Sequence, residues 1–137
     1  MATPTPTTWT EWNGSRGMAY WHGVWTTADN FTDSAIVDIS GLTPAPNVVK
    51  VLGVKAQLNG DIGATLEFDA TSDVLIYEFI NQSDSSLIDV ADFSNGPSGG
   101  RTGYSTGAGG TGDIILTTTN VASGDELTLL IFFEKKT

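Results

Sequence analysis

The sequence predicts a single all-β domain, a jelly-roll-like β-sandwich of about eight antiparallel strands with an extended N-terminal arm. An immunoglobulin-like sandwich is the alternative, although its Cys–Trp–Cys hallmark is absent. Short apolar runs alternate with polar residues at period two along nearly the whole chain, and turn residues separate the runs. No stretch shows the pattern of a long amphipathic helix. A length of 137 residues is that of one domain large enough to bury a core.

The N-terminal arm is predicted at residues 1–12 and the sandwich domain at residues 13–137. Thr and Pro alternate from Met1 to Thr8. Because proline fixes φ and lacks a backbone donor, this stretch should be extended and outside the core. Two interpretations stay open: a disordered tail, and an arm that becomes ordered against a neighbouring molecule.

The first part of the sandwich is rich in aromatic residues. Met18–Trp25 is predicted as a strand. Its alternation places Tyr20 and His22 on one face, and Trp21 and Trp25 on the other. Trp and Tyr are ordinary core residues and are also enriched at interface hot spots. We therefore expect about half of the aromatics in the core and the rest at a partner surface.

Seven further strands are predicted from the same alternation, and turn residues bound each of them. They are Ser34–Ile39, Val48–Leu58, Ala64–Asp69, Val74–Ile80, Ser86–Phe93, Asp113–Thr119 and Glu126–Glu134. Gly53 marks a bulge or bend in the second of these. Asn59-Gly60 is the strongest hairpin signal in the chain, so the strands before and after it are expected to pair. In the later strand, Leu66 and Phe68 are expected to face the core.

The last strand is the most apolar. One face is expected to carry Leu127, Leu129, Ile131 and Phe133. Leu130 and Phe132 then lie on the opposite face. Since a strand that is apolar on both faces is buried on both, we expect a neighbouring subunit to cover Leu130 and Phe132.

Ser94–Gly112 is predicted as a long flexible loop, because its many glycines cannot pack a core and are costly to order. Arg101 and Tyr104 are its only large side chains. Long loops in compact domains are usually functional or disordered. Whether this loop lies at an outer tip or against a partner stays open.

Charge and composition exclude several kinds of partner. The chain carries 16 acidic and 6 basic residues, for a net charge of -10. Nucleic acid is therefore not expected as a partner, since a phosphate-binding face needs clustered Lys and Arg. No apolar run is long enough for a membrane span and no signal peptide is visible, so we expect a protein made in the cytoplasm without membrane association.

No enzymatic activity and no cofactor are expected. The chain has one histidine and no cysteine, which argues against most metal sites and thiol chemistry. A triad through His22 is disfavoured because no nucleophile-elbow pattern accompanies it. Asp61, Asp69 and Asp73 could bind calcium, but the favoured interpretation is that they cap turns and keep edges soluble. The Gly107–Gly112 run lacks the Lys and the following helix of a phosphate loop.

Three segments resemble the small β-rich capsid decoration, or cement, proteins that tailed bacteriophages encode beside the major capsid protein. The segments are Leu66–Ile76, Gly112–Thr119 and Ala122–Leu129. The resemblance covers about residues 34–137 and rests on strand and turn motifs. It implies a jelly roll, often trimeric, on local three-fold sites of the capsid, with no catalytic residues.

The expected function is therefore that of a structural virion protein, a homotrimer that binds the major capsid protein on the outer surface of a capsid. The residues expected to contact the capsid are aromatic: Trp9, Trp12, Tyr20, Trp21 and Trp25. The alternative is a carbohydrate-binding or host-adhesion module on the same scaffold. A solvent-facing row of aromatics would favour the alternative, and aromatics buried against another chain would favour cement.

Overall fold

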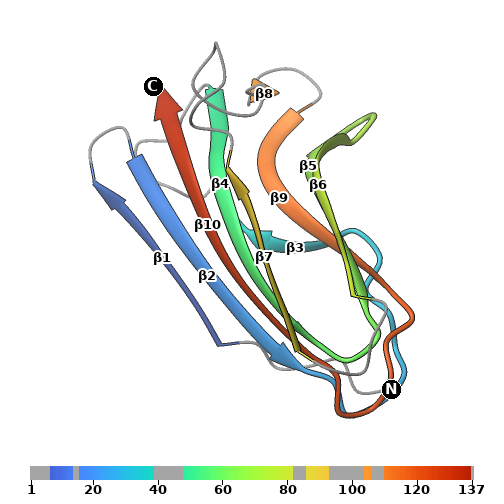
Figure 1. The fold of residues 1–137 in the computed structure, drawn as a ribbon. Coiled ribbons are helices and arrows are strands. Elements are labelled where there is room, and N and C mark those ends of the chain that lie inside the picture. Colours follow the sequence, from blue (N-terminus) through green and yellow to red (C-terminus); the bar gives the residue numbers. More distant parts are fainter. Residues whose placement is uncertain are drawn as a thin grey trace.

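The computed structural model shows an all-β sandwich (Figure 1). It describes residues 7–13, 16–38, 48–81, 86–92, 104–105 and 110–136. The strands are β1 (Thr7–Asn13), β2 (Arg16–Val24), β3 (Ser34–Val37), β4 (Val48–Asn59), β5 (Gly63–Ala70), β6 (Val74–Ile80), β7 (Ser86–Asp92), β8 (Tyr104–Ser105), β9 (Gly110–Thr119) and β10 (Glu126–Lys136). The fold class predicted from the period-two pattern is confirmed.

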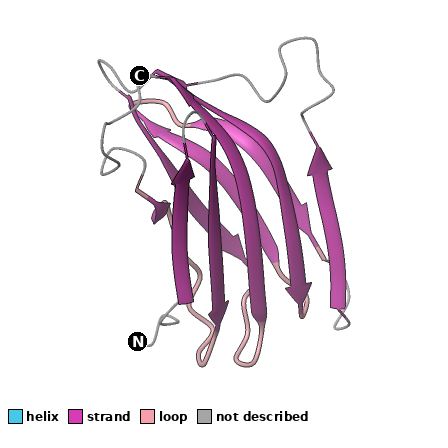
Figure 2. Cartoon of the chain, turned by 90° about the vertical axis from the view of Figure 1, so that its left-hand side faces the viewer, coloured by secondary structure: helices cyan, strands magenta, loops and turns pink. Residues whose placement is uncertain are grey.

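The strands form two antiparallel sheets. The larger sheet has six strands in the order β1-β2-β10-β4-β7, with the short β8 paired to β4. The smaller sheet has four strands in the order β3-β9-β5-β6. Figure 2, turned by 90°, shows only strands and their connections in the described part of the chain. That part contains no helix long and apolar enough to cross a membrane.

The strand pairing is that of a jelly roll. Strands pair in nested order, β2 with β10, β3 with β9, β4 with β7 and β5 with β6. This arrangement is a long hairpin wound so that successive strands alternate between two four-stranded layers, except for β5 and β6, which pair with each other at its tip. It differs from the immunoglobulin-like order, in which the chain stays longer within one sheet. The eight nested strands correspond to the eight that the sequence predicts.

The prediction of a hairpin at Asn59-Gly60 is wrong. The strand before it, β4, pairs with β10 and β7, whereas the strand after it, β5, pairs with β9 and β6. The turn therefore crosses from one sheet to the other. Gly60 has φ +105°, and the Asn81 side chain donates to the carbonyls of Gly60 (2.9 Å) and Leu58 (3.3 Å). A distant side chain thus holds an arch that a local sequence signal cannot distinguish from a hairpin.

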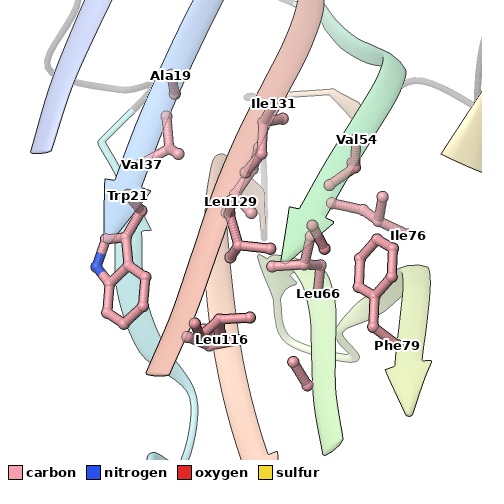
Figure 3. Close-up of a cluster of buried hydrophobic side chains, with 14 of the residues drawn as sticks. Ala19, Trp21, Val37, Val54, Leu66, Ile76, Phe79, Leu116, Leu129 and Ile131 are labelled. Atoms are coloured by element: carbon pink, nitrogen blue, oxygen red, sulfur yellow. The ribbon is translucent and has the colours of Figure 1, made fainter. Parts of the chain in front are cut away.

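The core lies between the inner faces of the two sheets (Figure 3). On the larger sheet, the face of β10 predicted to be apolar is fully buried, with Leu127, Leu129 and Phe133 each 0% exposed. On the smaller sheet, Leu66 and Phe68 are 0% exposed and face the core as predicted. The alternation read from sequence therefore identifies the inner face of both layers.

Aromatic side chains close one end of the core. Trp21 and Trp25 have ring centroids 6.0 Å apart, and Phe31 lies 5.8 Å from Trp21 and 5.3 Å from Trp25. The Trp25 Nε1–H donates to the carbonyl of Asp29 at 2.9 Å, so the indole is buried with its polar group satisfied. The Trp21 ring also occupies the space above Gly23, where an added Cβ would lie 2.7 Å from a ring carbon.

The described part of the predicted N-terminal arm is a strand. Residues 7–12 belong to β1, which pairs with β2 through Thr7–His22 and Asn13–Arg16. Residues 1–6 lie outside the described residues, and the boundary between arm and sandwich stays a prediction. Most of the predicted glycine-rich loop also lies outside the described residues, except for β8 and the first residues of β9.

Candidate binding surface

The outer face of the larger sheet presents side chains from four adjacent strands to solvent. Alternation and register place them in rows across β2, β10, β4 and β7. The rows are Val24, Glu126, Asn59 and Ser86; His22, Thr128, Gln57 and Ile88; Tyr20, Leu130, Lys55 and Val90; Met18, Phe132, Gly53 and Asp92; and Arg16, Glu134 and Lys50. We refer to the surface formed by these residues as the outer face of the larger sheet.

Large apolar side chains are exposed on this face. Ile88 and Val90 on β7 are each 59% exposed, and Phe132 on β10 is 39% exposed. Leu130 and Tyr20 belong to the same row as Val90 and are half-buried. Isolated exposed apolar residues are ordinary, but neighbouring ones on a flat sheet are typical of a contact surface.

The basic side chains that the structure describes all lie on the same face. They are Arg16 on β2 and Lys50 and Lys55 on β4. The strands of the smaller sheet contain no Lys or Arg, and they and their turns carry acidic residues instead. In a chain of net charge -10, the outer face of the larger sheet is thus the least acidic described surface. It also carries most of the exposed large apolar side chains, although Leu75 and Ile80 are exposed on the smaller sheet.

A hollow of about 390 Å³ opens on this face. Gly53 lies opposite Phe132 on one side and Asp92 on the other, and because it has no side chain, the space between these two neighbours stays open. A register shift at Phe132/Phe133 leaves Leu52 as an extra residue of β4, which confirms the bulge predicted at this point. The residues that line the hollow are Arg16, Leu52, Gly53, Val54, Lys55, Val90, Ala91, Asp92 and Phe132.

A polar network lies further along the same face. His22 Nδ1 and Thr128 Oγ1 share a hydrogen bond of 2.9 Å, and His22 Nε2 lies 3.4 Å from a carboxylate oxygen of Glu126. Asn59 donates to the other oxygen of Glu126 at 2.7 Å. The residue types are those of an acid–base–nucleophile set. However, β2 and β10 each lie between two strands, so their N–H groups are used in the ladders and do not form an oxyanion hole.

The smaller sheet carries a cluster of three carboxylates. Oxygens of Asp33, Glu67 and Asp73 all lie within 4.8 Å of one another. Partial burial, together with the nearby charges of Asp73 and Asp33, raises the pKa of Glu67 above its usual value. Three such oxygens are a partial ligand set for Ca²⁺, which takes six to eight in total.

The predicted calcium ligands do not come together as a group. Only Asp73 belongs to the carboxylate cluster, while Asp61 and Asp69 do not. The Asp73 carboxylate accepts a hydrogen bond from the Ala70 N–H at 3.0 Å, which is the turn-capping role favoured from the sequence. No further observation in the described residues indicates an ion, so we assign no metal here.

Two of the five aromatics expected at the capsid need correction. Trp21 is 3% exposed and Trp25 is 0% exposed, so both rings pack inside the chain and present no surface to a partner. Tyr20 lies on the outer face, as its opposite parity requires. Trp9 and Trp12 belong to β1, where Trp9 pairs with Tyr20 and Trp12 with Gly17; their side chains lie outside the described residues.

The remaining predicted residues fall in two places. Leu130 and Phe132, expected at a subunit interface, lie on the outer face in the rows of Tyr20 and Met18. Tyr104 belongs to β8 and pairs with Val49, with its side chain outside the described residues, as is the whole of Arg101. The structure thus brings Tyr20, Leu130 and Phe132 onto one surface.

Sequence analysis missed the contribution of β7 and of the basic residues to this surface. Ile88 and Val90 show an alternation with Asp89, but the segment looks like a weak strand, and alternation does not reveal which face is covered. Arg16 and Lys55 lie far apart in the sequence. They share one surface because their strands, β2 and β4, both pair with β10.

Comparison with known proteins indicates the fold alone. No protein-family model and no curated protein matches the chain. Similar solved structures include a pilus subunit of Bacillus endospore appendages (10% identity, TM-score 0.34, 100% of this chain and 96% of that chain). The coat protein of Tobacco streak virus (12%, 0.38, 88% and 86%) and a family 29 carbohydrate-binding module (6%, 0.35, 94% and 74%) are also similar. TM-scores this low carry no argument about this chain.

Proposed function

We propose that this protein is a structural virion protein that decorates the outer surface of a phage capsid, as a homotrimer. The observation that supports the proposal is the asymmetry of the sandwich. The outer face of the larger sheet carries most of the exposed large apolar side chains and all the described basic ones, whereas the smaller sheet carries acidic side chains and exposes only Leu75 and Ile80 among large apolar ones. Such a molecule has one face suited to a protein surface and another suited to solvent.

The outer face is the proposed contact surface. Tyr20, Leu130 and Phe132 lie in adjacent rows there, so residues expected at the capsid and at a subunit interface share one surface. Aromatic and large aliphatic side chains at the centre of a patch commonly contribute most of the binding free energy. Binding to the assembled shell, and not to its separate subunits, stabilises the shell by mass action.

A non-enzymatic role is part of the proposal. The His22, Glu126 and Thr128 network acts as a cross-strand link on a flat surface, since the neighbouring backbone donors are used in the sheet. The carbohydrate-binding alternative requires a solvent-facing row of aromatics, and Trp21, at 3% exposed, does not belong to such a row.

The test uses shells assembled from the major capsid protein of the same genome. Purified protein is mixed with the shells, and pelleting, cryo-microscopy and the shell melting temperature are measured. Saturable binding at regular positions with a raised melting temperature is expected. Light scattering should give the mass of three chains. Absence of binding to intact shells would contradict the proposed decoration of the capsid. A mass of one chain by light scattering would contradict the homotrimer.

A matched pair of substitutions locates the surface. Phe132→Ser alters the outer face of the larger sheet, and Leu75→Ser alters a comparably exposed residue of β6 in the smaller sheet (39% and 46% exposed). Loss of a central apolar contact commonly weakens binding by about tenfold or more. We expect this loss for Phe132→Ser and little change for Leu75→Ser. Equal behaviour of the two variants would place the contact elsewhere.

A further inference from the structure

We propose that the hollow over Gly53 binds an acidic, extended segment of a partner chain that inserts one large apolar side chain. The inference deepens the proposed function and rests on it for the identity of the partner. The hollow combines an apolar lining with two cations at its rim, and this pairing defines the chemistry of the occupant.

The shape of the hollow suits a single large side chain. Its volume of about 390 Å³ is near the lower end of small-ligand pockets, which span about 300–1,000 Å³. Phe132 and Val90, both partly exposed, stand on opposite sides of Gly53 and Lys55 in the rows of the sheet. Covering these two side chains removes apolar surface from water, which favours an apolar occupant.

The charge at the rim suits an acidic occupant. Arg16 and Lys55 line the hollow and are both exposed. Neither forms an ion pair with any residue in the described parts of the chain. The one acid that lines the hollow, Asp92, already has an interaction within the chain. Two cations without an ion-pair partner among the described residues, in a protein of net charge -10, are complementary to carboxylates on a partner.

The position of the hollow favours an extended segment. It opens between the side-chain rows of β10, β4 and β7, near the edge of the sheet where β7 has no further neighbour among the described strands. An extended segment that runs across β7, β4 and β10 can place one side chain over Gly53 and its flanking carboxylates beside Lys55 and Arg16, which lie on either side of β10. This is the recognition mode in which one side chain enters a pocket while neighbouring groups provide register.

The probe is a fluorescein-labelled peptide of Asp and Ser residues around one central Leu, and the control peptide has Ser in place of Leu. Fluorescence anisotropy should show saturable binding of the Leu peptide, with a Kd of about 0.1–1 mM as suits a shallow site. The control peptide should bind more weakly. Raising NaCl from about 50 mM to about 500 mM should weaken binding, because exposed ion pairs are screened.

Two matched pairs of variants test whether the peptide binds in the hollow over Gly53. Val90→Glu and Ile88→Glu alter residues of the same strand and face that are each 59% exposed, but only Val90 lines the hollow. Lys55→Gln and Gln57→Glu each lower the net charge by one at exposed positions of β4, but only Lys55 lines the hollow. We expect about fivefold or greater weakening for the first member of each pair, and less than about twofold for the second.

Several outcomes would overturn the inference. Equal binding of the two peptides, or equal loss in Val90→Glu and Ile88→Glu, would show that the hollow is not the site. Self-association of the wild-type chain that Val90→Glu abolishes, without peptide binding, would make a second copy the occupant instead. The shell-binding assay is read separately: shells that bind Val90→Glu normally leave the proposed function standing and reject the hollow, whereas shells that fail to bind wild type reject the function itself.

Discussion

Phe132 and Phe133 are neighbours in β10, yet they have opposite environments. Phe133 is 0% exposed in the core, and Phe132 is 39% exposed on the outer face of the larger sheet. The same contrast holds for Trp21 and Tyr20 on β2, of which the first is buried and the second half-buried. One pair of central strands therefore supplies the core with one face and the proposed contact surface with the other. Substitutions on the two faces should separate stability from binding.

The largest expected effect is on the inner face. Phe133→Ala should lower the free energy of unfolding by about 3–5 kcal/mol, because it removes a buried ring and leaves a cavity. Phe132→Ala should lower it by only about 1 kcal/mol, since much of its ring is already in contact with water. Urea unfolding of the two variants measures both values. Similar losses in the two variants would show that the outer face also belongs to a core.

A second effect concerns the polar side chain that holds one end of the core. Asn81→Leu should lower the free energy of unfolding by about 2–3 kcal/mol, because the carbonyls of Leu58 and Gly60 lose a donor in a buried setting. Gln57→Leu, an exposed change on the outer face, is the control and should stay within about 0.5 kcal/mol. An Asn81→Leu protein as stable as wild type would mean that water replaces the amide.

A third effect tests the fit of the inner face of β2. Gly23→Ala should lower the free energy of unfolding by about 1–3 kcal/mol, because its Cβ would lie 2.7 Å from the Trp21 ring and force that ring to move. The near-ultraviolet circular dichroism of the tryptophans should change with it. An unchanged spectrum together with wild-type stability would contradict the close contact between Gly23 and Trp21.

The smallest effect on the free energy of unfolding is expected on the acidic outer side of the smaller sheet. There a substitution should raise stability, whereas the substitutions above lower it. Because partial burial and the charges of Asp73 and Asp33 raise the pKa of Glu67, its ionisation disfavours the folded state. The penalty is fully present above the folded pKa and is lost as pH falls to the unfolded value of about 4.3. Glu67→Gln should therefore be slightly more stable than wild type at neutral pH.

Thermal unfolding at several pH values checks this prediction. The difference between Glu67→Gln and wild type should shrink as pH falls, and should vanish below about pH 4. Glu78→Gln, an exposed change on the neighbouring strand β6, serves as the charge-matched control. A gain for Glu67→Gln that is independent of pH would show that charge is not its cause.

The strands and their inner faces can be predicted from the pattern of the sequence. Period-two alternation predicts eight strands close to the observed bounds, and it separates Leu66 and Phe68 from their solvent-side neighbours. This succeeds because side chains of a strand alternate between two faces, so a buried face must be apolar at every second position. The resemblance to a jelly roll agrees with the nested pairing of the strands.

The pairing of the strands and the proximity of exposed residues depend on the three-dimensional fold. The turn at Asn59-Gly60 looks like a hairpin locally, but Asn81 holds it as an arch between sheets. Arg16, Lys55 and Val90 come together over Gly53 because β2, β10, β4 and β7 lie in that order in one sheet. Both results depend on contacts between residues far apart in the chain. Local alternation carries no information about such contacts, and for that reason the candidate site emerged only from the fold.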